Sequence, residues 1–230
     1  MSGLLVEDRN IVFPGDIVAQ GMDYLPSGDI VRIGDSLIST KIGLISLNNR
    51  IVKLIPLTGP YLPKRHDTVI GCVVSIGMSG WRLDIRWPFE ANLGLAEGSS
   101  EFIQRNSDLS RYYGVGDYVR VEITNVASSR IIDLSAKGPG LGKLGSGRVF
   151  FVKATRVPRI IGKQGSMVGL IKEHTGCRIS VGQNGVVWLS GEDPVKEELA
   201  VRAIRMIERE GHISGLTDRV QEFLKKETKI

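Results

Sequence analysis

The sequence predicts a multidomain α+β protein in which two small all-β modules precede a mixed domain of the order β-α-α-β-β-α. Two observations predict this fold class. Short β-rich segments separated by turn residues fill the chain as far as about residue 137. Beyond a glycine-dense stretch, the spacing of apolar residues changes from the period of strands to that of helices. We expect domains at residues 1–60, 61–140 and 146–230.

The first module is predicted from short apolar strands that alternate with turn signals such as Phe13-Pro14-Gly15-Asp16 and Pro26-Ser27-Gly28-Asp29. The expected strands are Ile17 to Ala19, Ile30 to Ile33, Leu37 to Thr40, Ile42 to Leu47 and Ile51 to Ile55. The apolar run Leu4-Leu5-Val6 precedes them. Either this run completes the core of the module, or part of the apolar surface of so small a module faces a protein partner, as we expect.

The middle segment predicts a five-stranded OB barrel, because five short strands are interrupted by a polar loop or short helix between the third and the fourth. The expected strands are Thr68 to Ile76, Trp81 to Trp87, Ala91 to Ala96, Tyr118 to Ile123 and Arg130 to Leu134. Trp81 and Trp87 share one strand face with Leu83 and Ile85, which favours packing in the core over base stacking.

The glycine-dense segment from Gly138 to Gly147 is predicted to be a flexible linker. A phosphate-binding P-loop is the alternative, and it requires Gly, four residues, and then Gly-Lys-Ser/Thr. Counted from Gly138, Lys143 stands where the second glycine is required and Leu144 where the lysine is required. The P-loop motif therefore fails.

The last third of the chain predicts helices and strands with clear end signals. The expected strands are Val149 to Ala154, Arg178 to Val181 and Val186 to Ser190, and the expected helices are Arg159 to Ile161, Ser166 to Thr175, Pro194 to about Gly211 and Thr217 to Lys226. Gly176 is a C-terminal cap, and Asp193 caps the long helix with Pro194 at its first position.

Positive charge is concentrated in the same third of the chain. From Leu141 onward there are 16 Lys or Arg against 10 Asp or Glu, whereas the remainder holds 14 against 15. A basic domain attracts phosphate polymers and anionic membrane surfaces, although a merely soluble surface would account for the same excess.

No targeting, metal or disulfide signal is seen. The start of the chain lacks a signal-peptide pattern, no apolar run reaches membrane-spanning length, and the two cysteines, Cys72 and Cys177, suit neither a disulfide scaffold nor a zinc site. We therefore expect a cytoplasmic protein with no metal site, no cofactor and no membrane partner.

The segment Gly162-Lys163-Gln164-Gly165 between two predicted helices is the strongest functional motif. Two glycines let the backbone turn tightly and let a phosphodiester approach without hindrance from Cβ atoms. The helix that begins near Ser166 offers backbone donors at its N-terminus, and Lys163 adds a cation. We expect single-stranded RNA to contact Arg159, Ile160, Ile161, Gly162, Lys163, Gln164, Gly165 and Ser166. A purely structural helix-helix turn is the alternative.

The run from Val157 to Met167 resembles the signature of a K-homology (KH) domain. Asp67 to Arg86 and Gly116 to Leu134 resemble, more weakly, the OB domain of ribosomal protein "S-one". The order of an N-terminal β module, an S-one domain and a KH domain resembles the KH-containing RNA-binding cap subunit of the archaeal exosome over nearly the whole chain. The other archaeal cap subunit ends in a zinc ribbon, and this chain has no Cys-x-x-Cys pair.

This resemblance implies a non-catalytic subunit, three copies of which cap a hexameric phosphorolytic ring, bind RNA and guide its 3′ end into the channel for 3′-to-5′ degradation. The candidates for pore-facing phosphate contacts are the loop cations Lys64, Arg65, Arg105 and Arg111, for which a solvated surface is the alternative. Phe89 is a candidate for base stacking, with core packing as the alternative. No catalytic motif occurs in the sequence. The alternatives are a stand-alone RNA-binding protein that acts in translation or transcription, and a nuclease that holds magnesium through scattered carboxylates.

Overall fold

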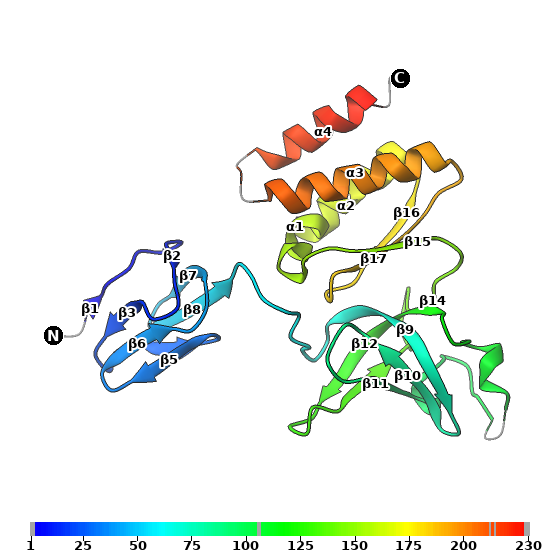
Figure 1. Cartoon of the computed structure of the whole chain (residues 1–230), viewed down its shortest axis with the longest axis horizontal. Helices are drawn as coiled ribbons and strands as arrows, with labels where there is room; N and C mark the ends of the chain where they lie inside the picture. The colour runs from blue at the N-terminus through cyan, green and yellow to red at the C-terminus, as the bar shows by residue number, and fades with distance from the viewer. Residues whose placement is uncertain (1–2, 105–106, 212, 214, 228–230) are drawn as a thin grey trace. The chain divides into compact units, whose positions relative to one another are not determined.

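The computed structural model describes residues 3–104, 107–211, 213 and 215–227 (Figure 1). The chain forms two compact units, Met1–Pro60 and Tyr61–Ile230. Each unit is described by itself below.

The N-terminal unit consists of two four-stranded sheets with the orders β1-β3-β6-β5 and β2-β7-β8-β4. Its strands are β1 (Gly3–Leu4), β2 (Ile11–Val12), β3 (Ile17–Gln20), β4 (Leu25–Ser27), β5 (Ile30–Ile33), β6 (Ser36–Ser39), β7 (Gly43–Asn48) and β8 (Ile51–Pro56). The core includes Val18, Leu37 and Ile45, all fully buried. Leu4 and Val6 pack against this core, so these two residues complete the module, whereas Leu5 remains exposed.

The second unit begins with a closed five-stranded barrel, as predicted. Its strands are β9 (Thr68–Gly77), β10 (Gly80–Asp84), β11 (Ala91–Gly94), β12 (Tyr118–Val126) and β13 (Ile132–Ser135). β12 pairs with both β9 and β13, and β13 pairs in parallel with β11, which closes the sheet on itself. Trp81 is 2% exposed and donates from Nε1 to the carbonyl of Tyr113 at 3.0 Å, which confirms that it packs in the core.

Among the strand predictions in these β modules that differ from the structure, two have a clear physical cause. Strand β10 stops at Asp84, before the alternating pattern ends, because Arg86 adopts a left-handed backbone (φ 60°) that cannot continue a strand. In the N-terminal unit, Pro26 and Ser27 lie in β4 although they are part of a predicted turn. β4 is an edge strand, where the missing N–H of a proline is tolerated.

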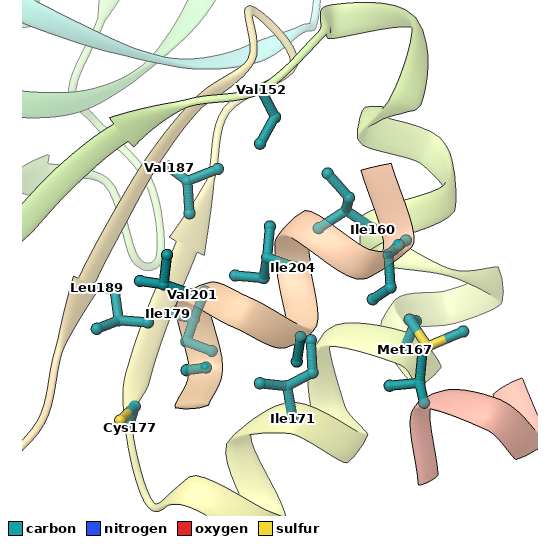
Figure 2. Packing of buried hydrophobic residues seen from close by; sticks show 14 of the residues in the cluster. Val152, Ile160, Met167, Ile171, Cys177, Ile179, Val187, Leu189, Val201 and Ile204 are labelled. Carbon is teal, nitrogen blue, oxygen red and sulfur yellow. The ribbon is translucent and has the colours of Figure 1, made fainter. Parts of the chain in front are cut away.

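The KH fold completes the second unit with the predicted order of elements. Its elements are β15 (Arg148–Phe151), α1 (Val157–Ile161), α2 (Ser166–Thr175), β16 (Arg178–Val181), β17 (Val186–Ser190), α3 (Pro194–Glu210) and the additional α4 (Leu216–Glu227). The strands pair in the order β15-β17-β16. Figure 2 shows the apolar core, in which Ile160, Met167 and Ile171 of the helices are buried with Val187 and Leu189 of β17.

The glycine-dense segment between the barrel and the KH fold is ordered, so the prediction of a flexible linker is wrong. Residues 142–147, called the strap below, begin with β14 (Gly142–Lys143), which pairs with β12. Lys143 contacts the Asp117 carboxylate, and the Gly145 carbonyl accepts from Trp188 Nε1 at 3.1 Å. A Cβ on Gly147 would lie only 2.7 Å from Trp188 Nε1. Gly147 therefore permits a close contact with Trp188 rather than flexibility.

A second connection joins the barrel to the KH hairpin loop Gly182–Gly185. The Asn184 side chain is 3% exposed, and its Nδ2 donates to the carbonyls of Ile70 (2.8 Å) and Ile85 (2.9 Å). Its Oδ1 accepts from the Ile70 amide at 3.3 Å. Ile70 also packs with Val186 and Trp188 in a small apolar cluster. The barrel and the KH fold are thus held together by both polar and apolar contacts.

Candidate nucleic-acid interface

The Gly162–Gly165 loop has a backbone that requires both glycines. Gly162 (φ 75°, ψ 174°) and Gly165 (φ 81°) adopt conformations that side chains disfavour, and Gln164 between them is left-handed as well (φ 54°). A Cβ on Gly162 would lie 2.7 Å from the Met167 amide nitrogen, whereas a Cβ on Gly165 would meet nothing within 4 Å. The first glycine thus lets the loop close onto its own helix, and the second leaves an open approach.

The two residues between these glycines face solvent. Lys163 and Gln164 are both exposed, as are the flanking Arg159 and Ser166. Helix α2 starts at Ser166 and runs for ten residues, so the positive end of its dipole lies at the loop. A mobile cation, a helix N-terminus and an unhindered backbone together form a site that suits a phosphodiester.

The two isoleucines before the loop have different environments. Ile160 is fully buried in the helical core, so it supports the loop from beneath and has no surface for an RNA base, which corrects the expectation of a contact there. Ile161 is partly buried at the edge of that core, as are Val168 of α2 and Val181 of β16. These three side chains supply the partly exposed apolar surface that an unstacked base would need.

The barrel candidates do not form one cluster. Lys64, Arg65 and Phe89 are exposed in loops at the end of the barrel where β9 begins and β10 ends. Arg111 is exposed in the long loop between β11 and β12, where its nearest acidic partner is Asp108 at 3.6 Å. Arg105 lies outside the described residues.

Sequence reasoning took the segment Val181 to Gly185 as a turn and as part of the family resemblance, but it did not foresee that the hairpin loop Gly182–Gly185 contacts the barrel. The signal was present, because this loop repeats the Gly-x-x-Gly pattern of Gly162–Gly165. Here a Cβ on Gly182 would lie 2.8 Å from the Ile70 amide nitrogen, so the glycine allows the loop to approach the barrel.

Acidic, histidine and cysteine side chains do not gather in the described part of the chain into a group of three that could hold a metal ion. Within the same residues, none of the helices has the length and apolar composition needed to span a bilayer.

The N-terminal unit carries exposed apolar rows on the outer faces of both sheets. Ile11, Leu44 and Ile55 lie opposite one another on three neighbouring strands, and Ile11 and Ile55 are 58% and 46% exposed. On the other sheet, Ile17 and Val31 both pair with Ile38. Residues 1–60 hold 5 Lys or Arg and 6 Asp or Glu. A neutral surface with apolar rows suits a protein partner better than a phosphate polymer.

The fold and the exposed loop define the chain as a multidomain protein of the KH class. Residues 147–206 match the KH domain family, and residues 9–58 match the family described as the exosome RNA-binding protein RRP4 N-terminal domain. A crystal structure described as an exosome complex RNA-binding protein shares 32% identity with a TM-score of 0.66, covering 74% of this chain and 98% of its own.

Two curated relatives extend the match to nearly the whole chain. The exosome complex component Rrp4 of Methanothermobacter thermautotrophicus is 40% identical over 99% of this chain and 71% of its own length. The exosome complex component Rrp4 of Thermococcus kodakarensis is 39% identical over 97% of this chain and 88% of its own. The chain therefore belongs to the Rrp4 family of exosome components.

Proposed function

We propose that this protein is a non-catalytic RNA-binding component of an exosome, and that it binds single-stranded RNA through the Gly162–Gly165 loop. The observation that carries the proposal is the exposed, left-handed loop at the N-terminus of α2, with Lys163 and Gln164 facing solvent. Membership of the Rrp4 family supports the assignment to an exosome rather than to a stand-alone RNA-binding protein of translation or transcription.

The finer assignment concerns the assembly. We propose that three copies cap a hexameric phosphorolytic ring in the cytoplasm and guide RNA 3′ ends into its channel, while the ring performs the cleavage. The exposed apolar rows of the N-terminal unit support docking of that unit on a protein partner, since its surface carries no positive excess.

Reconstitution with the ring subunits tests this function. Removing residues 1–56 is expected to leave a remainder that binds RNA but no longer co-purifies with the ring, because the KH fold and the barrel have their own cores. A sharper variant places two charges on one row, Ile11→Lys with Ile55→Lys, and Ile17→Lys with Val31→Lys serves as the matched pair on the other sheet.

Charging the row that contacts the ring is expected to abolish co-purification with the ring subunits. Charging the other row is expected to leave co-purification intact. Normal assembly of the truncated protein would show that the barrel or the KH fold makes the interface instead. The isolated full-length chain, incubated with labelled RNA, phosphate and magnesium, is expected to leave the RNA intact. Shortening that follows the protein through purification would contradict the non-catalytic assignment.

A further inference from the structure

Helix α4 lies outside the part of the chain that matches the KH domain family, because that match ends at residue 206. Its apolar side nevertheless belongs to the KH core. Val220 and Leu224 are fully buried, and Leu216 is 9% exposed. The helix packs against α2 as well as α3. The core beneath the KH helices is therefore completed by residues that the family pattern does not include.

Met167, the second residue of α2, connects α4 to the Gly162–Gly165 loop. A Cβ on Gly162 would lie 2.7 Å from the Met167 amide nitrogen and 2.8 Å from the Met167 Cβ, so the loop closes onto this residue. The Met167 side chain is 6% exposed and belongs to the same core cluster as the buried side of α4. Figure 2 shows Met167 at the side of the core where the ribbon of α4 passes. The residue that supports the loop is thus itself supported by α4.

The residues before the loop are supported from the same direction. Arg159 is exposed, but the stem of its side chain lies beside Gly211, where α3 ends. A Cβ on Gly211 would lie 3.6 Å from Arg159 Cγ. Both flanks of the loop therefore rest on the pair formed by α3 and α4.

Ion pairs fasten α4 to α3 at both ends. Arg219, in the first turn of α4, pairs with Glu210, the last residue of α3. At the other end Arg202 makes two hydrogen bonds to the carboxylate of Glu227, at 2.9 and 3.2 Å. Because these pairs are partly solvated, the buried apolar side supplies most of the attachment and the ion pairs adjust it.

The loop needs such support because its backbone is unfavourable. Gln164 has φ 54°, and residues in this region keep their conformation only where the surrounding structure holds them. We infer that α4 is a positioning element for the RNA-binding loop, which holds the loop in its binding form through Met167. Loosening α4 lowers RNA affinity in proportion to the population of that form that is lost. This inference rests on the proposed RNA-binding function and concerns the regulation of the same site.

Two valines of the KH core separate positioning from general destabilisation. Val220 lies on α4, whereas Figure 2 shows Val201 of α3 beside Ile179 and Leu189, on the side of the core away from Met167. In the full chain, Val220→Ala and Val201→Ala remove the same atoms from the same core and are expected to lower the denaturant midpoint alike. Only Val220→Ala is expected to weaken binding of a labelled single-stranded RNA, by about threefold.

Charge reversal at the end of α4 gives a second, independent test. Glu227→Arg breaks the pair with Arg202 while adding positive charge, so electrostatic attraction alone would tighten RNA binding. Positioning predicts weaker binding by up to about twofold instead, and recovery when Arg202→Glu restores the pair with opposite polarity.

The loop variant Lys163→Asp with Gln164→Asp completes the experiment. In that background Val220→Ala is expected to cause no further loss of affinity, because α4 acts through the loop. An equal loss in both backgrounds would mean that α4 contacts RNA itself and would overturn the inference. Equal losses from Val220→Ala and Val201→Ala, no loss from Val220→Ala, or tighter binding by Glu227→Arg would overturn it as well. Failure of the proposed function is seen separately, as unchanged RNA affinity of the loop variant alone.

Discussion

The KH fold contains two Gly-x-x-Gly loops that share a sequence pattern and differ in what they contact. In Gly162–Gly165 the central Lys163 and Gln164 are exposed. In Gly182–Gly185 the central Asn184 is 3% exposed and makes three hydrogen bonds to the barrel backbone. The pattern therefore specifies a tight backbone in both places. The central side chains face solvent in the first loop, where we propose the RNA contact, and hold the barrel in the second.

The first glycine of each loop illustrates the same difference. A Cβ on Gly162 would collide with the helix that the loop itself begins, at the Met167 amide. A Cβ on Gly182 would collide with the Ile70 amide of the barrel. Gly162 is required by the local path of the chain, whereas Gly182 is required because two segments far apart in the sequence lie close together. Only the requirement at Gly162 can be predicted from residues nearby in the sequence.

The largest expected effect is on the buried loop. Asn184→Asp replaces a donor to two carbonyls with a carboxylate that faces them, and a buried charge left without a partner destabilises a protein by about 3 kcal/mol or more. Denaturant unfolding of the full chain measures this loss. A loss of unfolding free energy below about 0.5 kcal/mol would mean that Asn184 is solvated rather than buried. The two loops would then no longer differ in the burial of their central side chains.

A smaller effect, on binding rather than stability, is expected at the exposed loop. Lys163→Asp with Gln164→Asp leaves the unfolding free energy within about 0.5 kcal/mol, because both side chains are solvated. RNA affinity is expected to fall about tenfold at low salt, and the difference from the unaltered chain to shrink as salt rises, since the lost interaction is ionic. Binding titrations at several salt concentrations measure both. If the variant keeps its RNA affinity at low salt, the principal RNA-binding surface lies on the barrel rather than at this loop.

The smallest expected effect concerns the strap. The hydrogen bond from Lys143 is the main cause that lowers the pKa of the Asp117 carboxyl below its ordinary value. A lowered pKa in the folded state contributes stability above the unfolded value of about 4 and loses it as the pH falls through the folded value. Lys143→Met should therefore cost less than about 1 kcal/mol near neutral pH, for a partly solvated pair. Thermal unfolding across pH is the measurement, and a difference that persists in strong acid would exclude this ion pair as its source.

Most of the fold could be predicted because its signals are local. Helix α2 and strands β16 and β17 have the predicted bounds, since Gly176 and the Gly182–Gly185 turn mark their ends. In the candidate site, the exposed Gly162–Gly165 loop between two helices was predictable, because the glycine spacing and the flanking helical pattern coincide there, and its contact with RNA stays a prediction. Ile160 could not be told from Ile161 in advance, because which of two adjacent apolar residues faces the core depends on how α1 packs.

The missed features depend on contacts between segments far apart in sequence. The order of the strap follows from Trp188, more than forty positions from the Gly145 carbonyl that accepts its Nε1–H. Likewise, the role of Asn184 follows from carbonyls that lie 114 and 99 positions away. Neither glycine content nor turn chemistry encodes such partners, so both segments were assigned only their local meaning.

The double attachment between the barrel and the KH fold has a thermodynamic consequence. Unfolding of the KH fold would expose Ile70, which packs against Val186 and Trp188. The backbone amide and carbonyl of Ile70 would also lose their hydrogen bonds to the Asn184 side chain. Each part therefore loses stability when the other unfolds, and residues 61–230 should melt as one cooperative block with a single calorimetric enthalpy. The three segments apparent in the sequence then correspond to two units of folding, although the barrel and the KH fold keep separate sheets and cores.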